Sequence, residues 1–317
     1  MKVVEHLERA DGPLISFEII PPLRGGNLAT LLQLIEDLAR FEPPFIDITS
    51  HAAQVSYEET RGGSLERRVK RKRPGTLGVC ALIQNKYNID AVPHVLCTGF
   101  TREETEDFLI ELKYLGIDNV LAIRGDDSGF QKPLVFGRSA NKYALNLVAQ
   151  IAAMNGGTYI EEDLLDSEPS NFCVGVAGYP EKHFESPNLD ADVRFTKAKI
   201  EAGAEYIVTQ MFFDNAHYFR YVEACREAGI TVPIIPGVKI LTTSRQLQSL
   251  PRTFFCEIPA ALADEAEGAD GPTVRRLGVE WAKQQAQELL DKGAPAIHFY
   301  VMANSKAVTR VVKGLKL

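Results

Sequence analysis

Ionisable side chains interrupt or close short apolar runs in this sequence, where they could take part in catalysis. Glu18 lies inside the run SFEIIPP, and Arg124, Gly125 and Asp126 close the run LAIRGD. A carboxyl group buried among apolar side chains has a raised pKa, which suits a general acid near neutral pH. Glycine lets backbone approach a ligand, arginine suits a phosphate or a flavin carbonyl, and aspartate can stabilise a developing cation. From the residues alone, Glu18 is equally well interpreted as a structural carboxylate that caps backbone or pairs with an arginine.

Other polar residues fit ligand binding, although each also has a structural interpretation. Gln210, in TQMFFD, has an amide that can donate to and accept from a heterocycle such as a pterin, or can satisfy backbone groups instead. His94 and His183 could contact a phosphate or a flavin ring, but isolated histidines more often lie satisfied in a core. Asp192 and Lys199 lie two turns apart on one helix face, so they could reach one extended ligand or simply face solvent.

The elements that position these side chains are eight short apolar runs, most of them separated by stretches with helical periodicity. Strands that alternate with helices predict a (β/α)8 TIM barrel, whose active site lies at the C-terminal ends of the strands. The predicted strands are Leu14–Pro21, Phe45–Ser50, Ile89–Cys97, Asn119–Asp126, Phe172–Pro180, Tyr206–Asp214, Pro233–Val238 and Ala296–Met302. The ends of the first six carry Glu18, Thr49, His94, Arg124 with Asp126, Tyr179 and Gln210. Their convergence at one end of a barrel predicts an enzyme.

Helices are predicted where apolar residues recur with helical spacing and where a glycine follows the last turn. These segments are Leu28–Phe41, Thr101–Leu115 with a capping box of Thr101 and Glu104, Asp190–Ala202, Asn215–Ala228 and Trp281–Lys292. Residues 155–171 are expected to form a surface insertion, and residues 242–273 are expected to hold an extra short helix near the barrel mouth. The basic run 67–73 is interpreted as a solvated helix face, and His298 as a core residue. We predict one domain, residues 1–317.

The composition is that of a globular protein with a large core. The chain has 317 residues, of which 45% are hydrophobic and 24% charged, and its net charge of −7 argues against a nucleic-acid partner. No apolar stretch approaches the roughly 20 residues that span a bilayer, and the start MKVVEHLERADG lacks a signal-peptide core. Five cysteines without CxxC spacing predict reduced thiols in a cytoplasmic protein, and the scattered histidines predict no metal site. Any dinucleotide must bind without a Rossmann fingerprint, because no GxGxxG motif is present.

Eight motifs together resemble the methylenetetrahydrofolate reductase family: SFEIIPP, IDITSHA, AVPHVLC, LAIRGD, VAGYPEKH, AGAEYIVTQMFFD, IIPGV and HFY. They cover nearly the whole chain in the family's order. The resemblance implies a flavoprotein barrel in which FAD carries hydride from NADH or NADPH to 5,10-methylenetetrahydrofolate by a ping-pong mechanism, giving 5-methyltetrahydrofolate. It also implies a homo-oligomer. Because the chain ends soon after the eighth strand, it is similar to the short bacterial form without a regulatory domain.

The resemblance also implies roles for individual residues. Glu18 matches the family's general acid, which helps to open the methylene bridge to the reactive iminium cation, and Asp126 matches the carboxylate that contacts folate and stabilises that cation. Gln210 matches a residue used by folate and nicotinamide, Gln246 matches a further folate contact, and Thr49 is also expected to contact substrate. The positions that match FAD contacts are Thr49, Ser50, Ala52, His94, Arg124, Gly125, Asp126, Tyr143, Ala144, Tyr179, His183, Ser186, Asp192 and Lys199.

Several positions depart from the family pattern. Asn304 follows HFYVMA where bacterial members often have an arginine, so the expected salt bridge to the folate glutamate tail is missing there. Phe195 and Ala198 replace polar flavin contacts, and Leu250 lies near a position that is aromatic in some members. Two alternatives remain: another flavin barrel of the proline-dehydrogenase type, and a non-catalytic folate-binding partner subunit. The sequence does not distinguish NADH from NADPH.

Overall fold

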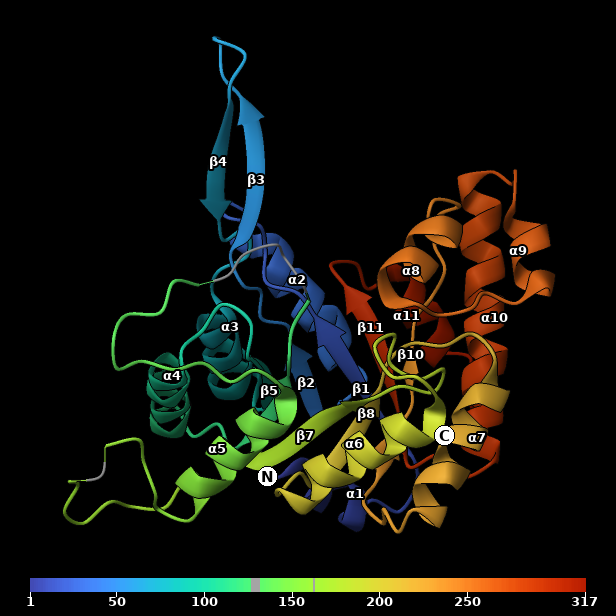
Figure 1. The fold of residues 1–317 in the computed structure, drawn as a ribbon. Helices are drawn as coiled ribbons and strands as arrows, with labels where there is room; N and C mark the ends of the chain where they lie inside the picture. Colours follow the sequence, from blue (N-terminus) through green and yellow to red (C-terminus); the bar gives the residue numbers. More distant parts are fainter. Residues whose placement is uncertain (127–131, 162) are drawn as a thin grey trace.

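Parallel strands form a barrel at the centre of the molecule (Figure 1). The computed structural model describes residues 1–126, 132–161 and 163–317. The barrel strands lie side by side in the order β10-β11-β1-β2-β5-β6-β7-β8-β9. Their bounds are β1 Leu14–Ile19, β2 Phe45–Ile48, β5 Asp90–Leu96, β6 Asn119–Ile123, β7 Cys173–Gly178, β8 Tyr206–Thr209, β9 Ile234–Ile235, β10 Gly237–Val238 and β11 Ala296–Met302. Each of the eight predicted runs therefore contains strand, and the predicted (β/α)8 barrel is confirmed.

The seventh run closes the ring in two short pieces. β9 pairs with β8, and β10 pairs with β11, on either side of Pro236. Proline has no N–H to donate to a neighbouring strand, which explains the interruption. The carbonyl of Pro236 still accepts the N–H of His298 at 3.0 Å, so the chain remains attached to β11 there.

Helices surround the barrel (Figure 1). Their bounds are α1 Val3–Arg9, α2 Leu28–Ala39, α3 Thr76–Leu82 continued by the π-helix η1 Ile83–Tyr87, α4 Arg102–Tyr114, α5 Ala144–Asn155, α6 Leu189–Glu201, α7 Asn215–Glu227, α8 Gln246–Phe254, α9 Ala260–Ala266, α10 Gly271–Asp291 and α11 Lys306–Val312. The capping box at α4 is present, with Thr101 and Glu104 bonded reciprocally. Residues 242–273 contain two helices, α8 and α9, where one was predicted, and α10 begins ten residues earlier than predicted. Asp270 caps α10 and Pro272 fits its first turn, a start signal that the prediction overlooked.

The barrel interior is filled in layers, as in other barrels of this type. The layer nearest the N-terminal end is apolar and holds Val3, Phe45, Val92, Leu121, Cys173, Tyr206, Val208, Ile235 and Ala296. The next layer is polar, with Ser16, Asp47, His94 and His298 all buried. The apolar layer separates these polar side chains from the lower end of the barrel.

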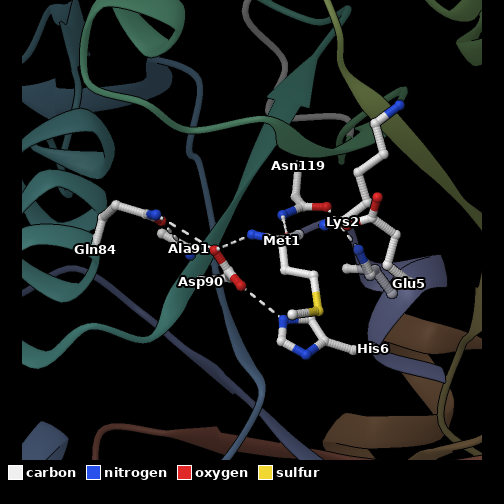
Figure 2. A network of polar contacts seen from close by, with 9 residues as sticks. Met1, Lys2, Glu5, His6, Gln84, Asp90, Ala91 and Asn119 are labelled. Carbon is white, nitrogen blue, oxygen red and sulfur yellow. Dashed lines mark hydrogen bonds and ion pairs between the residues drawn. The ribbon is translucent and has the colours of Figure 1, made fainter. Parts of the chain in front are cut away.

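A hydrogen-bonded network covers that lower end, and α1 provides much of it (Figure 2). The Val3 N–H donates to Asn119 Oδ1 at 2.8 Å, which ties the start of α1 to β6. Asp90, at the start of β5, lies 2.6 Å from His6 Nε2 and accepts a hydrogen bond from Gln84 at 3.3 Å. The network fixes α1 beneath the barrel.

An antiparallel hairpin projects from the opposite end of the barrel (Figure 1). It consists of β3 Gln54–Glu59 and β4 Leu65–Lys70 and forms a separate two-stranded sheet. The interpretation of the basic run 67–73 as a helix face is therefore wrong. Arg68 forms an ion pair at 3.0 Å with Glu58 on the facing strand and another at 3.0 Å with Glu66 on its own strand, and the cross-strand pair with Glu58 favours strand over helix here.

Residues 155–171 were predicted to form a surface insertion. Asn155 is the last residue of α5, and the other described residues of this range belong to no helix or strand. Within this segment Leu165 is 92% exposed. The cysteines are all buried and unpaired in the described structure. None of the described helices has the length and apolar character needed to cross a membrane.

Candidate active site

Glu18 lies near the C-terminal end of β1, level with Asp47 because the two residues are register partners on adjacent strands. The residue is only 9% exposed, and His94 Nε2 lies 3.4 Å from its Oε2. Burial raises the pKa of Glu18 to about 7, although His94 opposes the shift. The carboxyl group is therefore partly protonated near neutral pH, as a general acid requires.

A second carboxyl group, Asp47, lies beside Glu18 in the interior. It is fully buried, and neither carboxylate oxygen has a hydrogen-bond partner in the described part of the chain. His94 Nε2 lies 3.6 Å from Asp47 Oδ2, so this nitrogen faces both carboxyl groups. Burial raises the pKa of Asp47 to about 7, against the opposing effect of His298. Asp47 was not among the predicted site residues, although FIDITS carries the same signal as SFEIIPP, a carboxylate inside an apolar strand.

His298 of β11 is buried, as predicted, but its surroundings are polar. Its Nδ1 lies 2.8 Å from Ser16 Oγ, and its Nε2 lacks a partner among the described residues. Burial lowers the pKa of His298, while the nearby Asp47 opposes this effect. Asp47, His94 and His298 thus form an interior polar layer with unused donors and acceptors.

Lys239 follows β10 and contributes a positive charge near Glu18. Its Nζ donates to the Tyr300 carbonyl at 2.9 Å, and burial lowers its pKa to about 8 against the opposing effect of Glu18. A cavity of about 570 Å³ extends outward from here, and its lining includes Lys239, Tyr300, Gln246, Asn304, Arg275 and Lys306. Lys239 was not among the predicted site residues, although its position directly after an apolar strand run indicates a charged group at a strand end.

The two predicted amides both use their oxygens locally. Gln246 Oε1 accepts hydrogen bonds from Thr242 and Thr243 at 2.7 to 3.0 Å, and Gln210 Oε1 accepts the N–H of Met211 at 2.9 Å. Their Nε2 groups have no partners among the residues described. Each glutamine therefore keeps a donor for a ligand, and Gln246 lines the cavity.

Loops after β2 and β6 carry further predicted residues at the same end of the barrel. Thr49, Ser50 and Ala52 directly follow β2, and the N–H of Thr49 bonds the Ile19 carbonyl at 3.1 Å. Arg124 Nη1 lies 2.6 Å from Glu185 Oε2, an ion pair that joins the β6 and β7 loops. Asp126 is exposed, yet its charge contributes to raising the pKa of Glu18, which places it near the candidate acid.

Residues on α6 and the preceding loop form one connected group. Asp192 accepts hydrogen bonds from Ser186 Oγ at 2.9 Å and from the His183 N–H at 3.3 Å. Lys199 Nζ donates to the Ala177 carbonyl at 2.7 Å, and burial lowers its pKa to about 8. The alternative of a solvated face for Asp192 and Lys199 is wrong, because Asp192 is buried and the Lys199 ammonium is bonded to the backbone of β7. Tyr179 stacks edge-on against His183, with ring centroids 4.7 Å apart.

Four further predicted or departing positions lie at the helices around the barrel. Tyr143 caps α5 and Ala144 begins it, and Tyr143 lines a separate cavity of about 680 Å³. Tyr143 is 49% exposed, but its hydroxyl is near enough to Arg124 to influence that guanidinium. Phe195 is 62% exposed on α6, whereas Leu250 is buried within the α8 region and does not present a ring-stacking surface.

The residues present fit a polar heterocycle with a phosphate. Thr49 Oγ1 and His51 Nδ1 are buried without a hydrogen-bond partner in the described chain, directly after β2. Gly125 has a φ of +87°, a left-handed conformation that favours glycine, between the guanidinium of Arg124 and the carboxylate of Asp126. Unused polar atoms, a glycine in the left-handed conformation and cations therefore lie at one end of the barrel.

Comparisons with known proteins agree with this geometry. The sequence model for the family described as methylenetetrahydrofolate reductase matches residues 2–316. A 5,10-methylenetetrahydrofolate reductase of Salmonella typhimurium is 29% identical over 291 residues, covering 91% of this chain and 86% of its own length. A probable methylenetetrahydrofolate reductase (NADPH) of Caenorhabditis elegans is 29% identical over 317 residues, which are 99% of this chain and 44% of that protein.

The chain thus spans about half the length of the eukaryotic relatives and most of the bacterial one. Among solved structures, a protein from Clostridium thermocellum, described as binding two copies of 5-methyl-5,6,7,8-tetrahydrofolic acid, has a TM-score of 0.58. The match covers 98% of this chain and 96% of that one at 14% identity. This similarity supports the barrel fold.

Proposed function

This chain belongs to the methylenetetrahydrofolate reductase family, and we propose that it reduces 5,10-methylenetetrahydrofolate to 5-methyltetrahydrofolate with NADH or NADPH as the electron donor. The observation that carries the proposal is Glu18, a buried carboxyl group at a strand end whose pKa is raised to about 7. Such a group can give a proton to a leaving nitrogen at neutral pH, which the opening of the methylene bridge requires.

FAD is the cofactor that the site suits, and when bound it would supply hydride transfer between the two substrates. Thr49, His51, Arg124 and Gly125 would hold it from the loops after β2 and β6, with Ser186, Asp192 and Lys199 on the side of α6. Lys199 and Arg124 are the cations available for its phosphates. Because the barrel supplies these groups from separate strands, no Rossmann fingerprint is needed.

The folate and the nicotinamide would occupy the space above Glu18 in turn, as a ping-pong reaction requires. Gln210 and Gln246 retain amide donors for the pterin and the carboxamide, and Asp126 provides a negative charge for the cationic form of the substrate. Asn304 cannot form the ion pair that an arginine would form with the folate tail. Arg275 and Lys306 line the same cavity, and we propose that they bind the tail's carboxylates instead.

The absorbance spectrum of the purified protein tests the proposal. Flavin bands that bleach anaerobically with NADH or NADPH would exclude a flavin-free folate-binding subunit. Recovery of the bands on addition of methylenetetrahydrofolate, with formation of methyltetrahydrofolate, would exclude a barrel of the proline-dehydrogenase type. If proline bleaches the flavin bands and neither NADH nor NADPH does, the proposal is overturned. We also expect a cytoplasmic homo-oligomer, on the strength of the family resemblance.

A further inference from the structure

The β3–β4 hairpin has two chemically different faces. On one face, Arg68 and Lys70 form ion pairs with Glu58 at 3.0 Å, so its charges are largely satisfied within the hairpin. The register places Val55 opposite Val69, Tyr57 opposite Arg67 and Glu59 opposite Leu65 on the other face, which is mostly apolar. Tyr57 is 64% exposed, Leu65 70% and Val69 42%. An isolated two-stranded hairpin is at best marginally stable in water, so a partner that covers this apolar face would stabilise it.

The base of the hairpin is attached firmly to the barrel mouth. Arg73 Nη1 donates to the Pro21 carbonyl at 2.7 Å, and Arg71 Nε donates to the His51 carbonyl at 2.9 Å. The hairpin is therefore presented in a fixed direction, away from the body of the molecule (Figure 1). Its charge is also unlike the rest of the chain. Residues 54–73 contain seven Lys or Arg and three Glu, a net charge of +4, whereas the whole chain has −7.

A complementary surface lies in a second segment outside the strands and helices of the barrel. In the loop between α5 and β7, Leu164 is 45% and Leu165 92% exposed, and Asp163 and Asp166 flank them. Hydrogen bonds brace the base of this loop, from Ser167 Oγ to the Gly157 carbonyl at 2.7 Å and from Tyr159 to the Glu168 carbonyl at 2.8 Å. The loop thus presents an apolar tip between two carboxylates.

The two surfaces cannot meet within one chain. The hairpin follows the C-terminal end of β2, whereas the loop precedes the N-terminal end of β7, and parallel strands put these ends on opposite faces of a barrel. Figure 1 shows the hairpin at the top and the loop, coloured yellow-green, at the lower left. Two copies lying side by side in opposite directions would bring each hairpin to the other copy's loop, which is the reciprocal pattern of a twofold dimer.

We propose that the apolar face of the hairpin docks on the loop tip of a second copy of this chain. Tyr57, Leu65 and Val69 would cover Leu165, and Arg67, which has no ion-pair partner among the described residues, would meet Asp163 or Asp166. The proposal assigns surfaces to the homo-oligomer expected above, and it does not depend on the reaction. Aromatic and arginine side chains are the usual energetic centres of such contacts.

The experiment compares self-association of the purified full chain and its variants by analytical ultracentrifugation. We expect a dimer at micromolar concentration. Tyr57→Asp and Leu165→Asp should each raise the dissociation constant at least tenfold, since one buried anchor is typically worth more than about 1.4 kcal/mol. Ser56→Asp, on the same strand but the opposite face, is the matched control and should leave association unchanged. Circular dichroism would verify that each variant is folded.

Mixing the two variants identifies the contact. A Tyr57→Asp chain keeps its loop and a Leu165→Asp chain keeps its hairpin, so the mixture should associate more tightly than either variant alone. A monomeric wild type, or variants that associate as wild type does, would overturn the proposal. Weakening by Tyr57→Asp alone, with no gain on mixing, would also overturn it, because the hairpins would then pair with each other.

Discussion

The two ends of the barrel both contain half-buried or buried carboxyl groups, but the protein treats them in opposite ways. At the lower end, Asp90 contacts His6 at 2.6 Å and Gln84 at 3.3 Å (Figure 2). Burial alone would raise the pKa of Asp90, yet the hydrogen bonds, led by that from His6, outweigh it and lower the pKa. At the upper end, burial dominates and raises the pKa of both Glu18 and Asp47 to about 7.

We infer a role for each end of the barrel from this difference. A carboxylate with its partners in place stabilises the fold, and barrels commonly use the N-terminal end for stability. Carboxyl groups held in the interior without enough partners cost folding free energy, and such groups are concentrated at sites where a proton must move. The contrast predicts that changes at the upper end alter activity or stabilise the protein, whereas changes at the lower end only destabilise it.

The largest effect is expected for Glu18→Gln. Folate reduction should fall at least 100-fold, within the range of about 10²–10⁴ that general acids contribute, while flavin reduction by NAD(P)H remains near normal. Stopped-flow measurement of the two half-reactions separates these outcomes. Glu8→Gln, an exposed change on α1 at the lower end, is the matched control. Near-normal folate reduction by the Glu18 variant would mean that this carboxyl group is structural.

The pH dependence of the wild type should reflect the same carboxyl group. Only protonated Glu18 can act as the acid, so the folate half-reaction should slow as pH rises through about 7. Above that pH, the rate of the folate half-reaction should fall by nearly tenfold per pH unit, and this dependence should be absent from the Glu18→Gln variant. A profile that is flat from pH 6 to 9 would contradict the assignment.

Asp47→Asn should stabilise the protein at alkaline pH. Asp47 ionises near its ordinary pKa of 3.8 when unfolded but only at about 7 when folded, so wild-type stability falls as pH rises between these values. Asparagine does not ionise. The stability of the variant relative to wild type should therefore increase from pH 4 to pH 8, by about 2–4 kcal/mol. Urea denaturation at both pH values measures the change, and a pH-independent difference would show that Asp47 is not held protonated.

Much of this difference between the two barrel ends could be predicted from the sequence. Physical reasons explain why the remaining features could not. Apolar runs that carry Glu18, Arg124 or Tyr179 near their C-terminal ends predict both the barrel and the strand ends that form the site, because parallel strands present these ends together. The grouping of Asp47 with His298 was not predictable, since β11 comes alongside β1, the neighbour of β2, only when the barrel closes. The hairpin was missed because its order comes from cross-strand ion pairs, which a search for helical periodicity does not detect.

Asp90→Asn tests the lower end and should have the opposite sign to Asp47→Asn. Loss of the charged acceptor for His6 should cost about 2 kcal/mol at pH 7, a typical value for a hydrogen bond to a charged group. The pKa of Asp90 is lowered in the folded protein. Its ionised carboxylate therefore stabilises the fold fully at pH values above the ordinary pKa of aspartate, and this stabilisation is lost as the pH falls through the lowered pKa of the folded state. The difference from wild type should therefore shrink toward pH 3. Activity per folded molecule should be unchanged, and a loss of folate reduction would contradict the separation of the two ends.

The smallest effect is expected for His6→Ala, which removes one partner from Asp90 and leaves Gln84 in place. The loss should be about 1 kcal/mol in urea denaturation at pH 7, because the carboxylate keeps other donors. Repeating the change in the Asp90→Asn background gives a double-mutant cycle, in which His6→Ala should cost at most half as much. If the cost is equal in both backgrounds, His6 stabilises α1 by packing, and the lower network is less cooperative than its contacts indicate. A cost that disappears with Asp90 would instead establish that this end of the barrel is stabilised by the kind of hydrogen bond that Asp47 lacks among the described residues.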